Sequence, residues 1–494
     1  MGWVSTTSMA MRRRTAKCYN MQQVPKPEQG LFGQITGAMG ATYTLHAPGA
    51  LRDALRRGAA TVFHPWKAGP FYLNLPLNTQ PELVQFRADA LPVRPTFPTP
   101  AAPSDTTLAE AIDLIRSHER VTIKAGGGAR GAAAELTRFA EASGAAVVLS
   151  PGASGVLPDA HPQNMHVGGS KGSISGNYAM QEADLVIFVG SRGVCQADCS
   201  GMGWPKAHAV ININPDLQDV QHYNNTLALT GPAAGILSAL ADRLTAPETS
   251  TWLDTCAAKK AEWQAYKAER YEAAPLGADV WSQPVLSQPQ VIHLADQFAR
   301  RHGAIKFFDA GDVQANGFQV VEDQAPGETF TETGASYMGF AVSALLAAGL
   351  ADQGRYGIAF TGDGSFMMNP QVLIDAVEHG VHGTILLLDN RRMAAISHLQ
   401  LAQYGETYRT NDAVAVDYVA MAQSVDGVQA FWGGTTKDSL QNALTQAQAY
   451  PGLSLVHVPV YYGEDPLGGL GAWGNWNVGN WCADVQDKYA ATLI

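Results

Sequence analysis

Apolar runs and helical stripes alternate along most of this chain. Leu185–Val189 is a continuous apolar run that ends at Gly190, and Val121–Ile123 runs into three consecutive glycines. Strands that are buried on both faces have this pattern in parallel sheets with helical crossovers. The pattern therefore predicts an α/β fold built from doubly wound parallel sheets.

Breaks in this alternation divide the chain into blocks. Prolines recur every few residues from Pro92 to Pro103, which is typical of an extended linker. A charged stretch with helical character, Trp252–Tyr271, separates two later blocks that look alike. We therefore expect a first block over residues 1–90, a linker over 91–104, a second block over 105–245, a helix and linker over 246–287, and a third block with a tail over 288–494.

Composition narrows the class of protein. The 494 residues are 46% hydrophobic and 16% charged, as in a globular enzyme of several domains. No apolar run approaches about eighteen residues, so we expect no membrane span. The net charge of -11 argues against a nucleic-acid partner. The five cysteines are too scattered for a disulfide framework, which predicts a cytoplasmic protein.

The strongest chemical signal lies between residues 356 and 390. A buried strand, Gly357–Phe360, runs into the turn Gly362-Asp363-Gly364. Asn369 as N-cap and Pro370 as first helical residue predict a helix start, and the helix should stop at Gly380. A second strand, Thr384–Leu388, then ends at Asp389-Asn390.

This order of elements predicts a metal–diphosphate site. A strand–helix–strand crossover makes its two strands parallel, so Asp363 and Asn390 should both lie at carboxyl ends, where ligands of open α/β sheets bind. Gly362 and Gly364 would let the backbone turn sharply and approach a phosphate. Carboxylate, amide and carbonyl oxygens are hard ligands suited to Mg²⁺.

The same segment resembles a known family. Gly362-Asp363-Gly364, followed after 24 residues by Asp389-Asn390, is similar to the motif of thiamine-diphosphate-dependent enzymes. By this resemblance Asp363, the Asn390 side chain and the Arg392 carbonyl would hold Mg²⁺, while Gly364 and Ser365 would contact the diphosphate. The family usually has Asn in place of Asp389, a departure that the inositol-catabolic members share.

Two further segments carry the resemblance. Tyr337–Phe340 resembles the start of the family's cofactor-facing helix, where Met338 would support the bent thiamine. Gly311–Gln314 follows a predicted strand and resembles the family's other diphosphate-contacting loop, so Gly311 and Gln314 are candidate cofactor-binding residues.

The resemblance implies a function. The chain looks like a partial pyrimidine-binding domain, a middle domain and a diphosphate-binding domain of the acetolactate-synthase type, and it is also similar to the trihydroxycyclohexanedione hydrolases of inositol catabolism. The implied reaction cleaves or forms a carbon–carbon bond next to the carbonyl of a small 2-keto acid or cyclic diketone. The implied assembly is a homodimer or homotetramer.

One family feature is missing. The family's catalytic glutamate lies early in the pyrimidine-binding domain, whereas Glu28 and Glu82, the glutamates ahead of the linker, lack its surroundings and read as solvated surface. No catalytic acid is therefore assigned. The alternative function is a truncated or non-catalytic member of the family.

Two other candidates stay open. His398 lies close after Asn390 and could contact the substrate or transfer a proton, but Ala395 and Leu399 could equally form the pocket-facing side of that helix. Gly126–Gly128 could suggest a dinucleotide loop, and some family members bind FAD in the middle domain. The glycine spacing does not follow the dinucleotide pattern, so FAD is the less favoured cofactor.

Overall fold

The computed structural model describes residues 3–6, 32–76, 79–97, 102–170, 172–199, 201–278, 280–332, 334–351, 354–410, 414–461 and 483–494. It contains two compact units, Met1–Pro100 and Ala101–Ile494. The boundary between them falls inside the proline-rich segment.

The first unit holds a small parallel sheet in the order β1-β3-β2, formed by Trp3–Thr6, Phe71–Pro76 and Ala41–Thr44. In the described part of this unit the sheet is accompanied by α1 (Phe32–Met39) and α2 (Leu51–Val62). Its core is small because few apolar side chains meet there. The buried members are Leu45, Ala54, Phe71 and Leu73.

The second unit begins with a six-stranded sheet, here called the middle domain. All its strands run parallel in the order β6-β5-β4-β7-β8-β9. The strands are β4 (Val121–Ala125), β5 (Ala146–Leu149), β6 (Asn164–Val167), β7 (Leu185–Val189), β8 (Ala209–Asn214) and β9 (Thr226–Thr230). The helices are α3 (Asp105–Ser117), α4 (Ala133–Ser143), α5 (Ile174–Glu182), α6 (Cys195–Asp198) and α7 (Ala233–Ala241).

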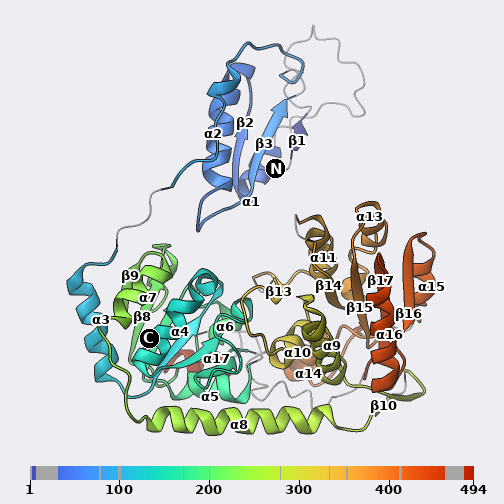
Figure 1. Ribbon diagram of the computed structural model, residues 1–494. Helices are drawn as coiled ribbons and strands as arrows, with labels where there is room; N and C mark the ends of the chain where they lie inside the picture. Colours follow the sequence, from blue (N-terminus) through green and yellow to red (C-terminus); the bar gives the residue numbers. More distant parts are fainter. Residues whose placement is uncertain are drawn as a thin grey trace. The chain divides into compact units, whose positions relative to one another are not determined.

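A long helix, α8 (Thr251–Tyr271), leads to the second six-stranded sheet, here called the C-terminal domain (Figure 1). Its strands are also parallel, in the order β13-β12-β14-β15-β17-β16. They are β12 (Ile305–Phe308), β13 (Thr329–Thr331), β14 (Gly357–Gly362), β15 (Gly383–Asp389), β16 (Val428–Trp432) and β17 (Leu453–Pro459). A short antiparallel pair, β10 (Leu276–Ala278) and β11 (Gln283–Val285), precedes this sheet.

Helices of the C-terminal domain connect these strands. They are α9 (Gln288–His302), α10 (Asp312–Val320), α11 (Phe340–Leu350), α12 (Asp363–Phe366), α13 (Val372–Glu378), α14 (Ala394–Tyr404), α15 (Tyr418–Gln423) and α16 (Lys437–Ala449). The last helix, α17 (Ala483–Ala490), returns to the middle domain, where Ile494 joins the core and the Leu493 carbonyl accepts a hydrogen bond from Asn225.

Side-chain alternation along the strands confirms that both large sheets are covered on both faces. In β7, Ile187 packs into one core cluster and Phe188 into the cluster on the opposite face. In β15, Leu386 and Leu387 divide in the same way. Because each strand is apolar on both faces, the sequence shows continuous apolar runs instead of polar–apolar alternation. The predicted α/β fold of doubly wound parallel sheets is confirmed.

One buried ion cluster supports the C-terminal sheet. Lys306 of β12 is 1% exposed, and its ammonium donates to Asp296 of α9 and, at 2.7 Å, to Asp323. Thr329 of β13 also donates to Asp323 at 3.0 Å. The cluster links a strand, a helix and the segment after α10, and each buried charge has an oppositely charged partner.

The helix after the glycine–aspartate–glycine turn begins later than predicted. Its N-cap is Gln371, not Asn369, and its first helical residue is Val372. The Asn369 amide instead donates to Ser343 of α11 at 2.9 Å. This tertiary contact occupies the side chain that would have capped the helix.

No described helix combines the length and the apolar character that crossing a membrane would require.

Candidate cofactor site

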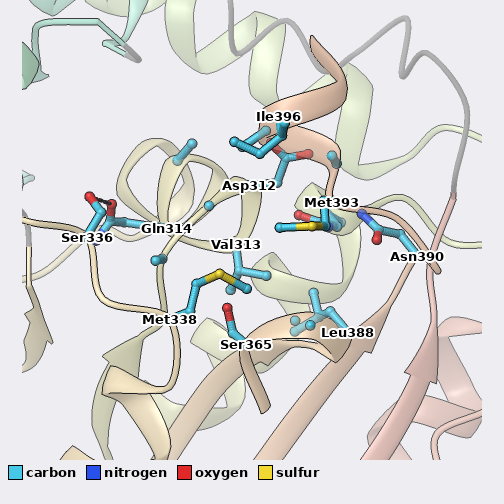
Figure 2. A pocket seen from close by; sticks show the side chains of 18 of the residues that line it. Asp312, Val313, Gln314, Ser336, Met338, Ser365, Leu388, Asn390, Met393 and Ile396 are labelled. Atoms are coloured by element: carbon cyan, nitrogen blue, oxygen red, sulfur yellow. Dashed lines mark hydrogen bonds between the residues drawn. The ribbon is translucent and has the colours of Figure 1, made fainter. Parts of the chain in front are cut away.

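A cavity of about 440 Å³ opens at the carboxyl ends of β12, β14 and β15 (Figure 2). A volume of this size suits a cofactor or a drug-sized ligand. The C-terminal domain supplies most of the wall, and the middle domain supplies Pro151, Val167, Gly168 and Ser170. The cavity therefore lies between two domains of the same unit.

The cavity brings together nine residues that the sequence singled out from four separate segments. They are Gly311, Gln314, Met338, Gly362, Asp363, Gly364, Ser365, Asn390 and Arg392. His398 is not among the lining residues; its Nδ1 lies 4.0 Å from Oδ1 of Asp312, which does line the cavity. Ala395 and Leu399 both line it, so the structure favours their side of α14 as the pocket-facing one.

Strand pairing places the two central polar residues next to each other. β14 and β15 are parallel, and Gly362 pairs with Leu388, so Asp363 and Asn390 follow neighbouring strand ends. Both are nearly buried, at 5% and 6% exposure. The Asn390 Oδ1 accepts the Arg392 backbone N–H at 3.1 Å and has a second lone pair for a metal.

The donor set fits Mg²⁺ that is shared with a phosphate ligand. One carboxylate, one amide oxygen and one backbone carbonyl are hard ligands that would leave further positions for phosphate oxygens and water. Among the residues that the structure describes, no three His, Cys, Asp or Glu side chains cluster to form a metal site by themselves. A metal here would therefore depend on oxygens of a ligand.

The turn glycines do not adopt a left-handed backbone, and their predicted approach to a phosphate stays a prediction. Gly362 has φ -83 and ψ 163, an extended conformation that any residue can adopt, and no left-handed φ occurs at Gly364. A Cβ added to Gly364 would lie 3.5 Å from the Met338 Cε, without a clash. Because Gly364 and Met338 both line the cavity, the missing side chain leaves room for a ligand.

The segment predicted to be a second diphosphate loop is the start of a helix. Gly311 has φ 85 and stands as the N-cap of α10, so a residue with a side chain would be strained there. Gln314 lies in the first turn, and its amide donates to Thr331 Oγ1 at 2.8 Å and to the Glu332 carbonyl at 2.7 Å. Ser336 donates to its Oε1 at 3.4 Å (Figure 2). Gln314 therefore also holds the cavity wall together.

Asp309 is a site residue that sequence reasoning missed. It follows β12, is fully buried, and accepts hydrogen bonds from Gly339 N at 2.8 Å and from Thr361 Oγ1 at 2.9 Å. Burial raises the pKa of this carboxyl, and its hydrogen bonds oppose the rise. Asp309 thus fixes the turn that carries Met338, although it does not line the cavity.

Two sequence profiles match this chain. The profile "Thiamine pyrophosphate enzyme, C-terminal TPP binding domain" matches residues 309–458, which include most of the cavity wall. The profile "Thiamine pyrophosphate enzyme, central domain" matches residues 108–240. The chain belongs to the thiamine pyrophosphate enzyme family.

Curated relatives agree with this family. The 3D-(3,5/4)-trihydroxycyclohexane-1,2-dione hydrolase of Listeria monocytogenes serotype 4b (strain F2365) is 26% identical over 469 residues, covering 89% of this chain and 72% of the relative. The enzyme of that name from Bacillus subtilis (strain 168) is 26% identical, with coverage of 89% and 72%. The acetolactate synthase isozyme 1 large subunit of Escherichia coli (strain K12) is 25% identical, with coverage of 84% and 70%. The predicted family is confirmed.

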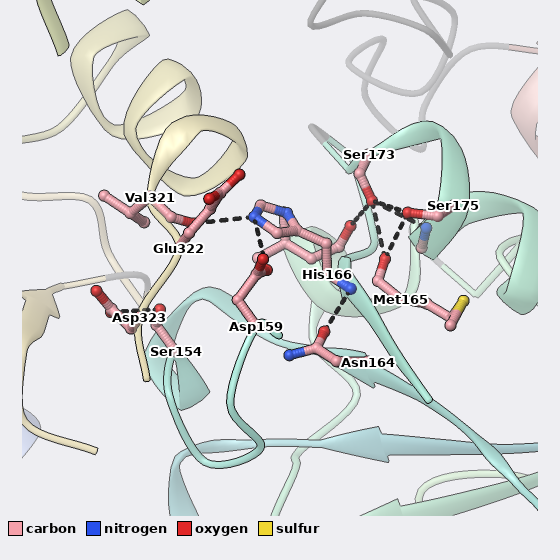
Figure 3. A network of polar contacts seen from close by, with 12 residues as sticks. Ser154, Asp159, Asn164, Met165, His166, Ser173, Ser175, Val321, Glu322 and Asp323 are labelled. Atoms are coloured by element: carbon pink, nitrogen blue, oxygen red, sulfur yellow. Dashed lines mark hydrogen bonds and ion pairs between the residues drawn. The ribbon is translucent and has the colours of Figure 1, made fainter. Parts of the chain in front are cut away.

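In this thiamine pyrophosphate enzyme, buried polar contacts support the part of the middle domain that lines the cavity. Lys124 is buried on β4 and donates from Nζ to the Gly168 carbonyl at 2.7 Å, and burial lowers the pKa of this lysine to about 7. His166, in a left-handed conformation with φ 68, meets the Val321 carbonyl at 2.9 Å across the domain boundary (Figure 3). The sequence carries no local signal for this wall, because Gly168 and Asp363 are far apart in the chain.

The glycine run after β4 has a packing role. A Cβ on Gly126 would lie 2.4 Å from the Gly190 carbonyl oxygen, and one on Gly128 would lie 2.8 Å from the Gly190 Cα. These glycines allow two loops at the carboxyl ends of β4 and β7 to touch. This close packing accounts for the glycines at these positions without a role in dinucleotide binding.

The two glutamates considered for the missing family position remain without a catalytic assignment. Glu82 is exposed after β3, as predicted for solvated surface. Glu28 lies outside the described residues.

Proposed function

We propose that this thiamine pyrophosphate enzyme binds thiamine diphosphate and Mg²⁺ in the cavity between the middle and C-terminal domains. The observation that carries the proposal is the convergence of Asp363, Asn390 and Arg392 at adjacent strand ends, on one wall of a cavity of cofactor size. In the proposed arrangement these residues hold the metal, Gly364 and Ser365 contact the diphosphate, and Met338 supports the thiamine.

The charges of the cavity wall support the proposal that a metal binds together with the diphosphate. Among the described residues that line the cavity, the charged ones are Asp312, Asp363 and Arg392, so two carboxylates accompany one guanidinium. A diphosphate would meet a net negative wall unless a divalent cation lay between the two. The apolar side chains of Val313, Leu388 and Met393 offer a surface for the cofactor's rings.

The proposed reaction is cleavage or formation of a carbon–carbon bond next to a carbonyl. The cofactor, when bound, supplies the electron sink for such a reaction. The relatives are named as a diketone hydrolase and an acetolactate synthase, which supports a small 2-keto acid or a cyclic diketone as the substrate. In this proposal the residues of this chain bind and orient the cofactor.

The proposed domain roles follow the same assignment. Residues 1–90 correspond to part of a pyrimidine-binding domain, 105–245 to the middle domain and 288–494 to the diphosphate-binding domain with its tail. A homodimer or homotetramer in the cytoplasm is proposed on the family resemblance, and mass photometry of the purified chain measures the assembly directly.

The test is a calorimetric titration of the full chain with thiamine diphosphate, with and without Mg²⁺. We expect binding that requires Mg²⁺, and we expect Asp363→Ala to abolish it. Asp375→Ala is the matched control, because Asp375 lies on α13 and is not among the cavity-lining residues. Unchanged affinity in Asp363→Ala would refute the site.

A second experiment separates an enzyme from a non-catalytic family member. The cofactor-loaded chain is incubated with pyruvate or with a cyclic 1,2-diketone, and consumption of the substrate is followed by mass spectrometry. Turnover that depends on the cofactor supports the enzyme. Tight cofactor binding without any turnover would favour the non-catalytic alternative.

A further inference from the structure

Asp389, the residue at which this chain departs from the usual family motif, has a specific partner. Its Oδ2 lies 3.0 Å from Nε2 of His457, and both residues are buried, at 2% and 4% exposure. Asp389 ends β15 and His457 lies on β17, the next strand of the sheet. The pair therefore connects the turn after β15 with the neighbouring strand.

The other carboxylate oxygen of Asp389 holds the turn itself. Oδ1 accepts the backbone N–H of Arg391 at 3.0 Å, and the Asp389 carbonyl accepts the Val460 N–H at 3.0 Å. Arg391 has φ 55, a left-handed conformation that is uncommon for a residue with a long side chain. A conformation of this kind persists only when surrounding contacts hold it in place.

His457 is itself held in position. Its ring makes edge contacts with Tyr418, Trp432 and Trp281, with centroids 5.2, 5.0 and 6.3 Å away. The Arg391 guanidinium lies over the Trp281 ring at 6.0 Å. Aromatic packing therefore fixes the imidazole, and the imidazole fixes the carboxylate that holds the turn.

The turn carries two of the three proposed metal ligands. Asn390 and Arg392 flank the left-handed Arg391, and the Asn390 amide already accepts the Arg392 N–H at 3.1 Å. A rotation of the backbone at Arg391 would move Arg392 relative to Asn390 and to Asp363, which belongs to a different strand–helix junction. Ligand geometry at Mg²⁺ is strict, so such a shift would weaken metal binding.

We propose that the Asp389–His457 pair is the positioning device of the metal site: it holds the turn 389–392 in the conformation in which Asn390 and Arg392 face the cation. The inference rests on the proposed function of the cavity. Neither Asp389 nor His457 lines the cavity, so the pair acts through the turn and not by contact with the cofactor.

The pair predicts a graded effect of substitutions. Asp389→Asn keeps an oxygen for the Arg391 N–H and places an amide N–H near the His457 ring, whose Nε2 accepts a hydrogen bond in the other neutral tautomer. Asp389→Ala removes both contacts. His457→Phe keeps an aromatic ring among its neighbours but removes the hydrogen bond. His382→Phe is the matched control, because His382 lies just before the first residue of β15, at the strand end away from Asp389. Its Nε2 lies 3.2 Å from the Gln448 carbonyl oxygen, so this substitution also removes a histidine hydrogen bond.

The first measurement needs no cofactor. Hydrogen–deuterium exchange of the full chain, read on peptides that span residues 386–398, reports how well the turn is held. We expect exchange to be at least about tenfold faster in Asp389→Ala and His457→Phe, and close to the unsubstituted rate in Asp389→Asn and His382→Phe. Unchanged exchange in both Asp389→Ala and His457→Phe would overturn the proposal, whatever the cavity binds.

The second measurement is the Mg²⁺ concentration needed for half-maximal binding of thiamine diphosphate. We expect it to rise about 10- to 100-fold in Asp389→Ala and His457→Phe, the usual loss when a group that orients metal ligands is removed. Asp389→Asn should restore it to within about threefold, which general destabilisation would not do. Normal Mg²⁺ dependence in a folded Asp389→Ala variant would overturn the proposal, whereas absent binding in the unsubstituted chain would instead refute the proposed function.

Discussion

Replacing Asp309 by alanine tests how the cofactor-facing turn is held. The substitution leaves the N–H groups of Ala310 and Gly339 without their side-chain acceptor in a buried place. The Thr361 hydroxyl would keep the Gly362 carbonyl, at 3.3 Å, as an acceptor. A buried donor that loses its partner costs about 1–3 kcal/mol, so we expect Asp309→Ala to lower the free energy of unfolding by roughly 2–6 kcal/mol. Urea denaturation at pH 7, followed by tryptophan fluorescence, measures this difference.

Asp309→Asn is the control for the same position. The asparagine oxygen can still accept the Gly339 N–H, and its amide can donate to the Thr361 hydroxyl, so we expect a loss below about 1.5 kcal/mol. Because burial raises the pKa of Asp309, its contribution to stability is greatest at acid pH and falls as the pH rises through that raised pKa. The stability of Asp309→Asn relative to the unsubstituted chain should therefore improve with rising pH. An alanine variant within about 0.5 kcal/mol of the unsubstituted chain would refute this reasoning.

Three further predictions address the fold. Gly126→Ala should destabilise the middle domain by about 1–3 kcal/mol because its Cβ would meet the Gly190 carbonyl at 2.4 Å, whereas Gly131→Ala, with open space around it, should be neutral in thermal unfolding. Lys306→Met should cost about 3–5 kcal/mol in urea denaturation, since two buried aspartates would lose their cation; a loss below about 1 kcal/mol would contradict this. Burial lowers the pKa of His293 to about 4, so the contribution of neutral His293 to stability is present above pH 6.5 and is lost as the pH falls toward 4. Between pH 7 and pH 5 the melting temperature of His293→Phe should therefore fall less than that of the unsubstituted chain.

Local pattern was sufficient to predict the strand–turn–helix–strand unit between residues 357 and 390. Its strands are apolar on both faces, and a crossover of that length makes them parallel, so adjacency of Asp363 and Asn390 followed from order alone. The start of α13 was placed two residues early, because Asn369 bonds Ser343 of a different helix. That contact has no trace in the local sequence.

What the sequence by itself determined was the sheet architecture, the family motif and the strand ends where the candidate ligands lie. What only the tertiary structure decided was which groups surround them: the middle-domain wall at Gly168, the buried Asp309, and the His457 partner of Asp389. For Gly364 the structure shows no left-handed backbone and leaves space in the cavity beside it. The physical reason is the distance along the chain over which each kind of information acts. Hydrophobic periodicity depends on the few neighbouring residues that share a strand or helix face. A cavity and its supporting contacts arise where segments that are distant in the sequence pack together.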